Sequence, residues 1–291
     1  MQSNDKELSD FSAPSILSAS TDYDRNFDDL AHRFCKNIYG TTKGAIRQSI
    51  VNEDLSLWYD SDRAQNIIEK KGYLHVVEAG GGDGRNAINW ALMGHKVTFC
   101  DISHEMIKIA EQKAQEAGVG DKIDFLHLEA QSIGHHLSEK ADLLVCHAVL
   151  EWIAKPAPFI ESLYDILSDD GSMSLMFYNA DAAFFRNAIM GNFKALLKGE
   201  VKRVEHSLVP LYPLSLSQVE KMLDESGFDI FHKTGVRVFH DYLHFPKQRE
   251  TEFEALLALE RRYCREIPYV QLGRYIHLMA ESKKNKSYSK K

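Results

Sequence analysis

Residues 76–84, VVEAGGGDG, place an acid and four glycines directly after a short apolar stretch. RNAINWALM follows, and its pattern predicts a helix. A strand that ends in a glycine-rich turn and restarts as a helix lets the backbone approach a ligand, because glycine has no side chain. Phosphates, dinucleotides and adenosyl cofactors are all bound at turns of this kind. The turn therefore predicts a nucleotide site and leaves the kind of nucleotide open.

Polar residues also follow the next three apolar stretches. Asp101 ends the second stretch, Ala130 and Gln131 follow the third, and His147 follows the apolar run of the fourth. In a doubly wound sheet such strand ends meet at one edge, where ligands bind. Asp101 is placed there to accept hydrogen bonds from ribose hydroxyls.

The spacing of the glycines separates the cofactor classes. No Lys-Ser/Thr pair follows them, which excludes a P-loop. Gly82, Gly84 and Ala87 fit the loose dinucleotide pattern, so a nicotinamide cofactor stays open, although Asp101 lies 17 residues beyond Gly84. The order of acid, glycine turn and polar strand ends resembles a class I S-adenosylmethionine (SAM) methyltransferase, and this resemblance implies SAM as the cofactor.

From residue 74 the sequence alternates between strand-like and helix-like segments. The strand-like segments are mostly continuous runs of Val, Ile, Leu and Phe, which is typical of strands buried on both faces. Strands that alternate with helices predict a doubly wound, Rossmann-like α/β fold. We expect a mostly parallel seven-stranded sheet, with strands near 74–79, 96–101, 123–130, 141–152, 171–179, 229–243 and 273–281.

The flanking segments suggest how the chain is divided. Residues 1–22 are polar and Ser-rich and predict a flexible extension before a methyltransferase domain at 23–291. The stretch 180–215 is too long for a simple crossover, so we expect an inserted helical cap there. The chain ends in a basic tail, with five lysines in its last nine residues.

Composition bounds the class of protein. A hydrophobic fraction of 44% over 291 residues supports a large core. No apolar run approaches the roughly 18 residues of a membrane span, and no secretory signal pattern is present. The four cysteines show no paired spacing, so we expect a cytoplasmic protein. The net charge of −7 argues against a large nucleic-acid footprint and leaves a local basic face open.

Strings outside the cofactor core resemble one bacterial family. NFDDLAHRFCKNIYGTTKGAIRQ, HAVLEW, LMFYNA, TGVRVFHDYL and LGRYIH are similar to the tRNA 5-carboxymethoxyuridine methyltransferases, over roughly residues 23–280. The resemblance implies that the carboxyl group of a modified wobble uridine is methylated to its methyl ester. The implied partner is the anticodon stem-loop of tRNA, with no obligate protein partner evident. A SAM enzyme for a small-molecule or protein acceptor and a catalytically silent nucleotide-binding protein remain alternatives.

The same resemblance implies seven cofactor contacts. Arg47 would meet the methionyl carboxylate, Asp101 would hold the ribose, and His147 would lie near the methionyl portion. Two glycines would approach the cofactor through their backbone, and two residues after the third strand would flank the adenine. The implied set is Arg47, Gly80, Gly81, Asp101, Ala130, Gln131 and His147.

A carboxylate acceptor needs no general base, because with a pKa of about 4 it is already ionised at neutral pH. The enzyme must instead align the carboxylate and remove its water, for which one positioned cation is suited. Arg237 is our first candidate to orient the substrate, followed by Tyr178 and His240. The string HDYLH at 240–244 imitates a zinc motif but lies in an extended stretch, so we expect no metal. Candidate contacts to tRNA phosphates are Lys194, Lys198, Lys202 and Arg203 in the cap, with Arg261, Arg262 and Arg265 near the end of the chain.

Overall fold

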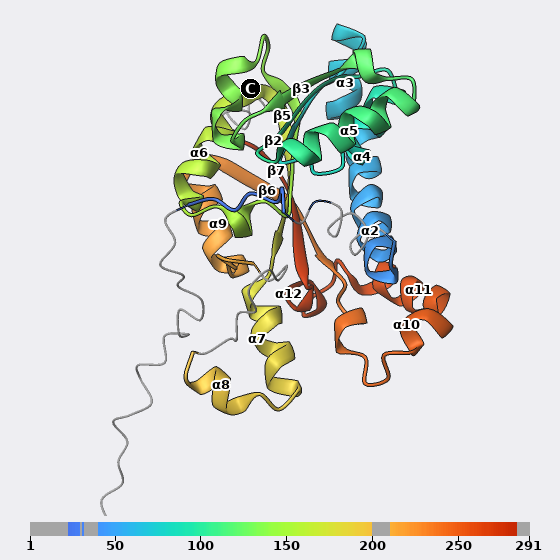
Figure 1. Cartoon of the computed structure of the whole chain (residues 1–291), viewed down its shortest axis with the longest axis vertical. Helices are drawn as coiled ribbons and strands as arrows, with labels where there is room; N and C mark the ends of the chain where they lie inside the picture. Colours follow the sequence, from blue (N-terminus) through green and yellow to red (C-terminus); the bar gives the residue numbers. More distant parts are fainter. Residues whose placement is uncertain (1–22, 30, 32–39, 200–209, 284–291) are drawn as a thin grey trace, which may run out of the picture.

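The computed structural model describes residues 23–29, 31, 40–199 and 210–283, which form a seven-stranded sheet with helices on both faces (Figure 1). The strand order is β3-β2-β1-β4-β5-β7-β6. β7 pairs antiparallel with β5 and β6, and the other neighbours pair parallel. The predicted doubly wound, mostly parallel sheet is confirmed. The strands are β1 (His75–Ala79), β2 (Lys96–Asp101), β3 (Ile123–His127), β4 (Ala141–His147), β5 (Leu167–Tyr178), β6 (Phe228–Val236) and β7 (Tyr275–Ser282).

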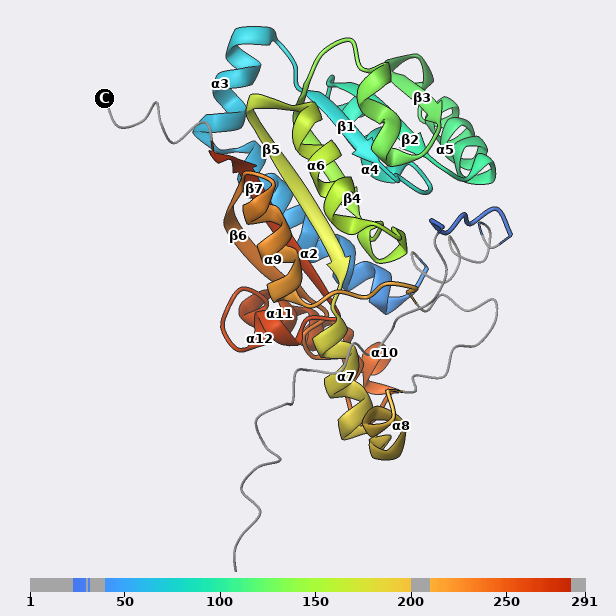
Figure 2. The same cartoon turned by 90° about the vertical axis from the view of Figure 1, so that its left-hand side faces the viewer.

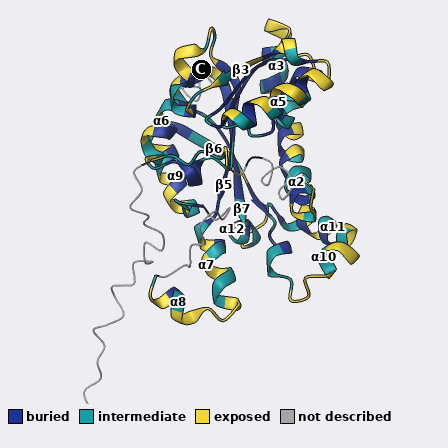
Figure 3. Ribbon diagram, viewed as in Figure 1, coloured by how far each residue is buried: buried dark blue, intermediate teal, exposed yellow. Residues whose placement is uncertain are grey.

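Two apolar clusters hold helices to the two faces of the sheet. α2, α3, α4 and α5 share one cluster with the strands, and α11 joins it against α2. α6 and α9 share the other cluster. The strands between these layers are the most buried part of the molecule (Figure 3). The helices are α2 (Thr42–Tyr59), α3 (Asp62–Lys71), α4 (Arg85–Leu92), α5 (His104–Glu116), α6 (Pro156–Ile166), α9 (Leu216–Glu225) and α11 (Phe253–Tyr263).

Short helices lie beyond the carboxyl end of β5 (Figure 2). Asn179 follows this strand, and its side chain accepts the first hydrogen bond of α7. The Asn179 amide also donates to the carbonyl oxygens of Gln271 and Gly273, which joins α7 to the chain before β7. The helices at this end are α7 (Ala180–Ile189), α8 (Phe193–Leu197), α10 (Gln248–Thr251) and α12 (Tyr269–Leu272).

Three strands are shorter than their apolar patterns predicted, and the first of them, β3, ends at His127 rather than at residue 130. β4 ends at His147 and β6 at Val236, because the next residues, Ala148 and Arg237, have φ of 59° and 63°. This left-handed backbone cannot continue a strand. A short 3-10 helix follows each turn, and buried apolar residues within and after the turns extend the pattern past the true strand end.

Parts of the predicted organisation lie outside the described residues. These are the extension at 1–22, residues 200–209 of the expected cap, and all but Lys283 of the lysine-rich tail. Among the described helices, none has the length and apolarity needed to cross a bilayer.

Candidate active site

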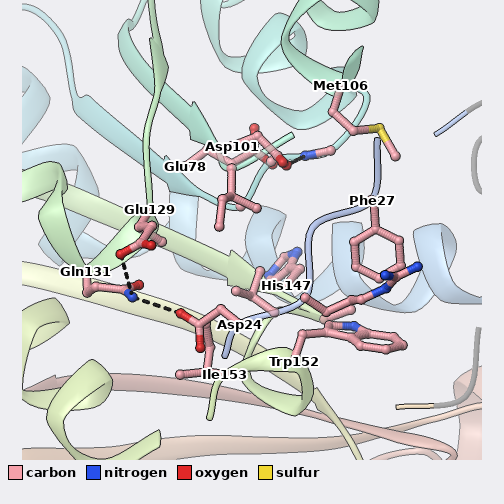
Figure 4. Close-up of a pocket in the computed structure, with 18 of the residues that line it drawn as sticks. Asp24, Phe27, Glu78, Asp101, Met106, Glu129, Gln131, His147, Trp152 and Ile153 are labelled. Atoms are coloured by element: carbon pink, nitrogen blue, oxygen red, sulfur yellow. Dashed lines mark hydrogen bonds between the residues drawn. The ribbon is translucent and has the colours of Figure 1, made fainter. Parts of the chain in front are cut away.

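One pocket at the carboxyl edge of the sheet contains every residue predicted to hold the cofactor (Figure 4). α2, the β1–α4 turn and the ends of β2 and β4 each contribute to it. The short helix η2 (Ala130–His136), after β3, supplies Ala130 and Gln131. The predicted residues that meet here are Arg47, Gly80, Gly81, Asp101, Ala130, Gln131 and His147.

Two buried acids line this pocket beside the glycine turn. Asp101 accepts hydrogen bonds from the backbone N–H of Gly82 at 2.9 Å and of Ser103 at 2.8 Å. Glu78 accepts one from the N–H of Ala87 at 2.9 Å. Burial raises the pKa of Asp101 to about 6 and that of Glu78 to about 8. Each Asp101 oxygen keeps a second lone pair, which can accept a ribose hydroxyl.

The first two glycines of the turn serve packing as well as ligand approach. Gly80 has φ of 69°, and a Cβ at this position would collide with the side chain of Val149. A Cβ at Gly81 would collide with the ring of Phe99 on β2. Val149 itself lines the pocket. The sequence predicted these glycines only from the close approach of a cofactor. The structure adds that larger residues at both positions would collide with neighbouring side chains of the protein itself.

A segment ahead of α2, residues 23–29, lies along the same pocket and was not predicted as part of it. Asp24 accepts a hydrogen bond from the Gln131 side-chain amide at 2.8 Å. Asp28 accepts one from the Ser103 hydroxyl at 2.6 Å. The segment therefore joins the η2 side of the pocket to the start of α5. The sequence carries little signal for this, because 23–29 has no apolar periodicity.

A second pocket adjoins the first and is rich in cations. The two pockets share Arg47, Ala148 and Trp152 as a common wall. Burial lowers the pKa of Lys43 in this pocket; Asp241 opposes that effect and neighbouring arginines add to it. The charged residues that line the second pocket are Lys43, Arg47, Glu151, Arg237, Arg249 and Glu250, with His240 beside them.

Tyr275 on β7 orders two of these arginines. The guanidinium carbons of Arg47 and Arg237 lie 5.4 Å and 5.3 Å from the centroid of its ring. Cation–π contacts of this kind hold a guanidinium in place and leave N–H groups to bind an anion. The candidate Tyr178 packs edge-on against Tyr275, with centroids 5.6 Å apart, and is not among the residues that line the second pocket.

Arg237 is nearly buried, with 11% of its side chain exposed. Its Nε lies 3.0 Å from Oδ2 of Asp241, without the alignment of a hydrogen bond. Within the described part of the chain, the guanidinium has an ion-pair partner and no hydrogen bond. Its N–H groups are therefore available to a ligand in the second pocket.

Glu260 on α11 holds the turn that follows Arg237. Its carboxylate accepts hydrogen bonds from the backbone N–H groups of Val238, Phe239 and His240, at 2.7, 3.0 and 2.8 Å. The candidate His240 has a fully buried side chain, and its Nε2 lies in hydrogen-bond contact with the Thr42 hydroxyl at 3.1 Å. His240 thus braces the wall of the pocket against α2.

Glu151 is a buried acid of the second pocket that the sequence did not single out. It is 1% exposed, and its Oε2 has no hydrogen-bond partner among the described residues. Burial raises the pKa of Glu151 to about 7, and Arg47 partly opposes this. The residue lies within the apolar string HAVLEW, which was predicted as part of a strand. That prediction gave no indication that Glu151 lines a pocket.

The fold and the first pocket define a class I SAM-dependent methyltransferase. Residues 77–175 match the methyltransferase domain family. The crystal structure of magnesium protoporphyrin IX methyltransferase from Synechocystis PCC 6803 with bound SAH shares the fold, with a TM-score of 0.53 and 19% identity over 87% of this chain and 94% of that one. The arginine, the glycine turn and the buried acids of the pocket fit SAM, which is the cofactor.

Within that class, the chain belongs to the tRNA 5-carboxymethoxyuridine methyltransferase family. It is 46% identical over 265 residues to the protein of that name from Escherichia coli (strain K12), which covers 90% of this chain and 98% of the relative. The ubiquinone biosynthesis O-methyltransferase of Photobacterium profundum is more distant, at 26% identity over 72% of this chain and 83% of the relative. The family resemblance found in the sequence strings is confirmed.

Proposed function

We propose that this enzyme transfers the methyl group of SAM to the carboxylate of 5-carboxymethoxyuridine at the wobble position of tRNA, which gives the methyl ester. Family membership supports the substrate. The observation that carries the proposal is the cationic second pocket, because it shares a wall with the cofactor pocket and can hold an anionic acceptor beside it. Because its substrate is tRNA, we also propose that the enzyme is cytoplasmic.

This reaction requires the enzyme to orient the acceptor carboxylate and remove its water, and it requires no general base. Bound SAM supplies a methyl group on a positively charged sulfur, and the acceptor carboxylate is already ionised at neutral pH. The protein holds that carboxylate in line and excludes water from it. Trp152, which lines both pockets, and Tyr275, which lines the second, help to keep water out.

Arg237 orients the carboxylate in this proposal. Its guanidinium is held against Tyr275 and has no hydrogen bond within the described residues, so it can bind an oxygen of the acceptor. Asp241 lies beside it and reduces its net charge. The pair thereby positions the nucleophile without fully neutralising it, which preserves its reactivity.

The helices beyond β5 are our proposed contact for the tRNA backbone. Lys194 lies on α8 and Lys198 at its end, and both are exposed. Each phosphate contact would contribute through release of counterions, so the affinity for tRNA should fall with salt. Of the other candidates, Lys202 and Arg203 lie outside the described residues. Arg261 and Arg265 pair with Glu53 on α2, which leaves them less suited to phosphates than the two exposed lysines.

The test uses tRNA isolated from cells that lack the enzyme. Mass spectrometry of the digested tRNA should show conversion of 5-carboxymethoxyuridine to its methyl ester when protein and SAM are added. Arg237→Ala should slow single-turnover methyl transfer on the order of 100-fold at saturating tRNA, while SAM affinity stays within about twofold. Arg63→Ala is the matched control, because Arg63 pairs with Glu281 outside both pockets.

Two results would contradict the proposal. A rate for Arg237→Ala equal to that of the control at saturating tRNA would remove Arg237 from the acceptor site. Methylation of a small free carboxylic acid with the same efficiency as tRNA would favour the small-molecule alternative.

A further inference from the structure

A chain of buried polar groups runs from α2 through three strands to the cofactor pocket. The Ser174 hydroxyl on β5 lies 2.8 Å from Nε2 of His147 on β4 and 2.7 Å from Nε2 of His277 on β7. Nδ1 of His277 lies 2.7 Å from Oδ2 of Asp54 on α2. Asp54, Ser174 and His277 are all buried, and only His147 reaches the pocket.

The order of protons along this chain follows from its acidic end. Burial opposes ionisation of Asp54, but hydrogen bonds from His232 and His277 outweigh it and lower the pKa of Asp54. The carboxylate is therefore ionised and only accepts, so Nδ1 of His277 carries a proton. Arg265 also donates to Asp54, at 2.7 Å and 2.9 Å, which already balances the buried charge.

Because Arg265 already balances the charge of Asp54, the arrangement with the fewest buried charges leaves Nε2 of His277 facing Ser174 as an acceptor. This Nε2 then has no hydrogen and accepts the hydroxyl proton of Ser174. The Ser174 oxygen in turn accepts the N–H at Nε2 of His147. Burial lowers the pKa of His147 well below its ordinary value, and Arg47 adds to this effect, so this ring is neutral. Its Nδ1 is left with a free lone pair.

That lone pair belongs to a ring that lines the cofactor pocket together with Arg47. Within the described part of the chain, the His147 ring bonds to the protein through Nε2, and Nδ1 makes no hydrogen bond. Bound SAM carries an ammonium next to the carboxylate that Arg47 can hold. An N–H at Nδ1 would point a second donor at this ammonium and repel it, whereas a lone pair at Nδ1 can accept a hydrogen bond from it.

We propose that Asp54, His277 and Ser174 are positioning residues that fix the tautomer of His147, so that its Nδ1 accepts a hydrogen bond from the ammonium of bound SAM. The inference concerns cofactor recognition and requires no tRNA. Its outcome is therefore independent of the substrate proposed above.

Ser174→Ala cuts the chain with a small change of volume, and Ser172→Ala is its matched control. Ser172 lies two residues earlier on β5, is equally buried, and its hydroxyl has no hydrogen-bond partner in the described residues. The probes are S-adenosylhomocysteine and its analogue without the α-amino group, titrated by calorimetry. Ser174→Ala should weaken binding of the first about tenfold and leave binding of the second unchanged. Ser172→Ala should alter neither.

A purely structural role for Ser174 predicts equal losses for both probes, and that result would overturn the proposal. NMR of the cofactor-free wild-type protein with nitrogen-15-labelled histidine gives a second readout that needs no variant. The His147 ring should show a proton on Nε2 and none on Nδ1. A protonated Nδ1 in the wild type would also overturn the proposal, even if Ser174→Ala failed to fold.

Discussion

Replacing Glu260 by glutamine tests whether one buried carboxylate holds the turn that presents Arg237. Oε1 of Glu260 accepts from Phe239 and His240, and Oε2 accepts from Val238 at 2.7 Å. A glutamine oxygen can keep the first two hydrogen bonds, but its amide nitrogen then faces the N–H of Val238. One hydrogen bond to a charged group is lost and one buried donor is left unpaired. The free energy of unfolding should therefore fall by about 2–3 kcal/mol.

Urea unfolding measures this loss, and Glu254→Gln is the control because Glu254 is exposed on the same helix. The control should change the free energy of unfolding by less than about 0.5 kcal/mol. Methyl transfer should slow in Glu260→Gln while SAM affinity is retained, because residues 238–240 do not line the cofactor pocket. A stability equal to that of the control would refute the assignment of Glu260 as the anchor of this turn.

Three further predictions follow from the buried acids and the glycine turn. The pKa of Glu78 is raised to about 8 in the folded state, so the folded protein binds more protons than the unfolded chain between about pH 5 and 8, and its stability falls as the pH rises. Glu78→Gln should make the loss of unfolding free energy between about pH 5 and pH 8 smaller by an amount on the order of 3–5 kcal/mol. Urea unfolding of wild type and variant at these two pH values measures the loss, and an equal loss in both proteins would contradict the prediction. Glu151, with its pKa of about 7, becomes negative above neutrality, so kcat/KM for the anionic acceptor should decline toward pH 9 and Glu151→Gln should abolish the decline. A rate that instead rises with pH would indicate a general base. Gly80→Val should abolish SAM binding in calorimetry, because of its positive φ and its collision with Val149; affinity within about threefold of wild type would contradict this.

The cofactor site was largely predictable from the sequence because its residues lie at the ends of consecutive strands. The glycine turn, Asp101 and His147 each follow an apolar run, and parallel strands bring such ends together. Local patterns also located the strands, since continuous apolar runs indicate burial on both faces. The ends of β4 and β6, which were placed too late, show the limit of such patterns, because apolar residues continue past Ala148 and Arg237.

Contacts between distant elements could not be obtained in this way. Asp54 and His277 are 223 residues apart, and nothing in the local sequence of either indicates a shared hydrogen bond. From the local sequence, Glu260 is predicted only as a charged residue of a helix, and Tyr275 only as an aromatic residue of a strand. Their roles arise only when α11 and β7 pack beside α2.

The sequence by itself determined the class of fold, the cofactor edge and the family, because these depend on short-range periodicity, on turn chemistry and on strings of residues. The tertiary structure decided which cations meet around Tyr275, which buried acid has a raised pKa, and that hydrogen bonds link Asp54 to His147. Burial and electrostatic environment depend on what packs around a group in three dimensions, and a linear pattern does not carry that information.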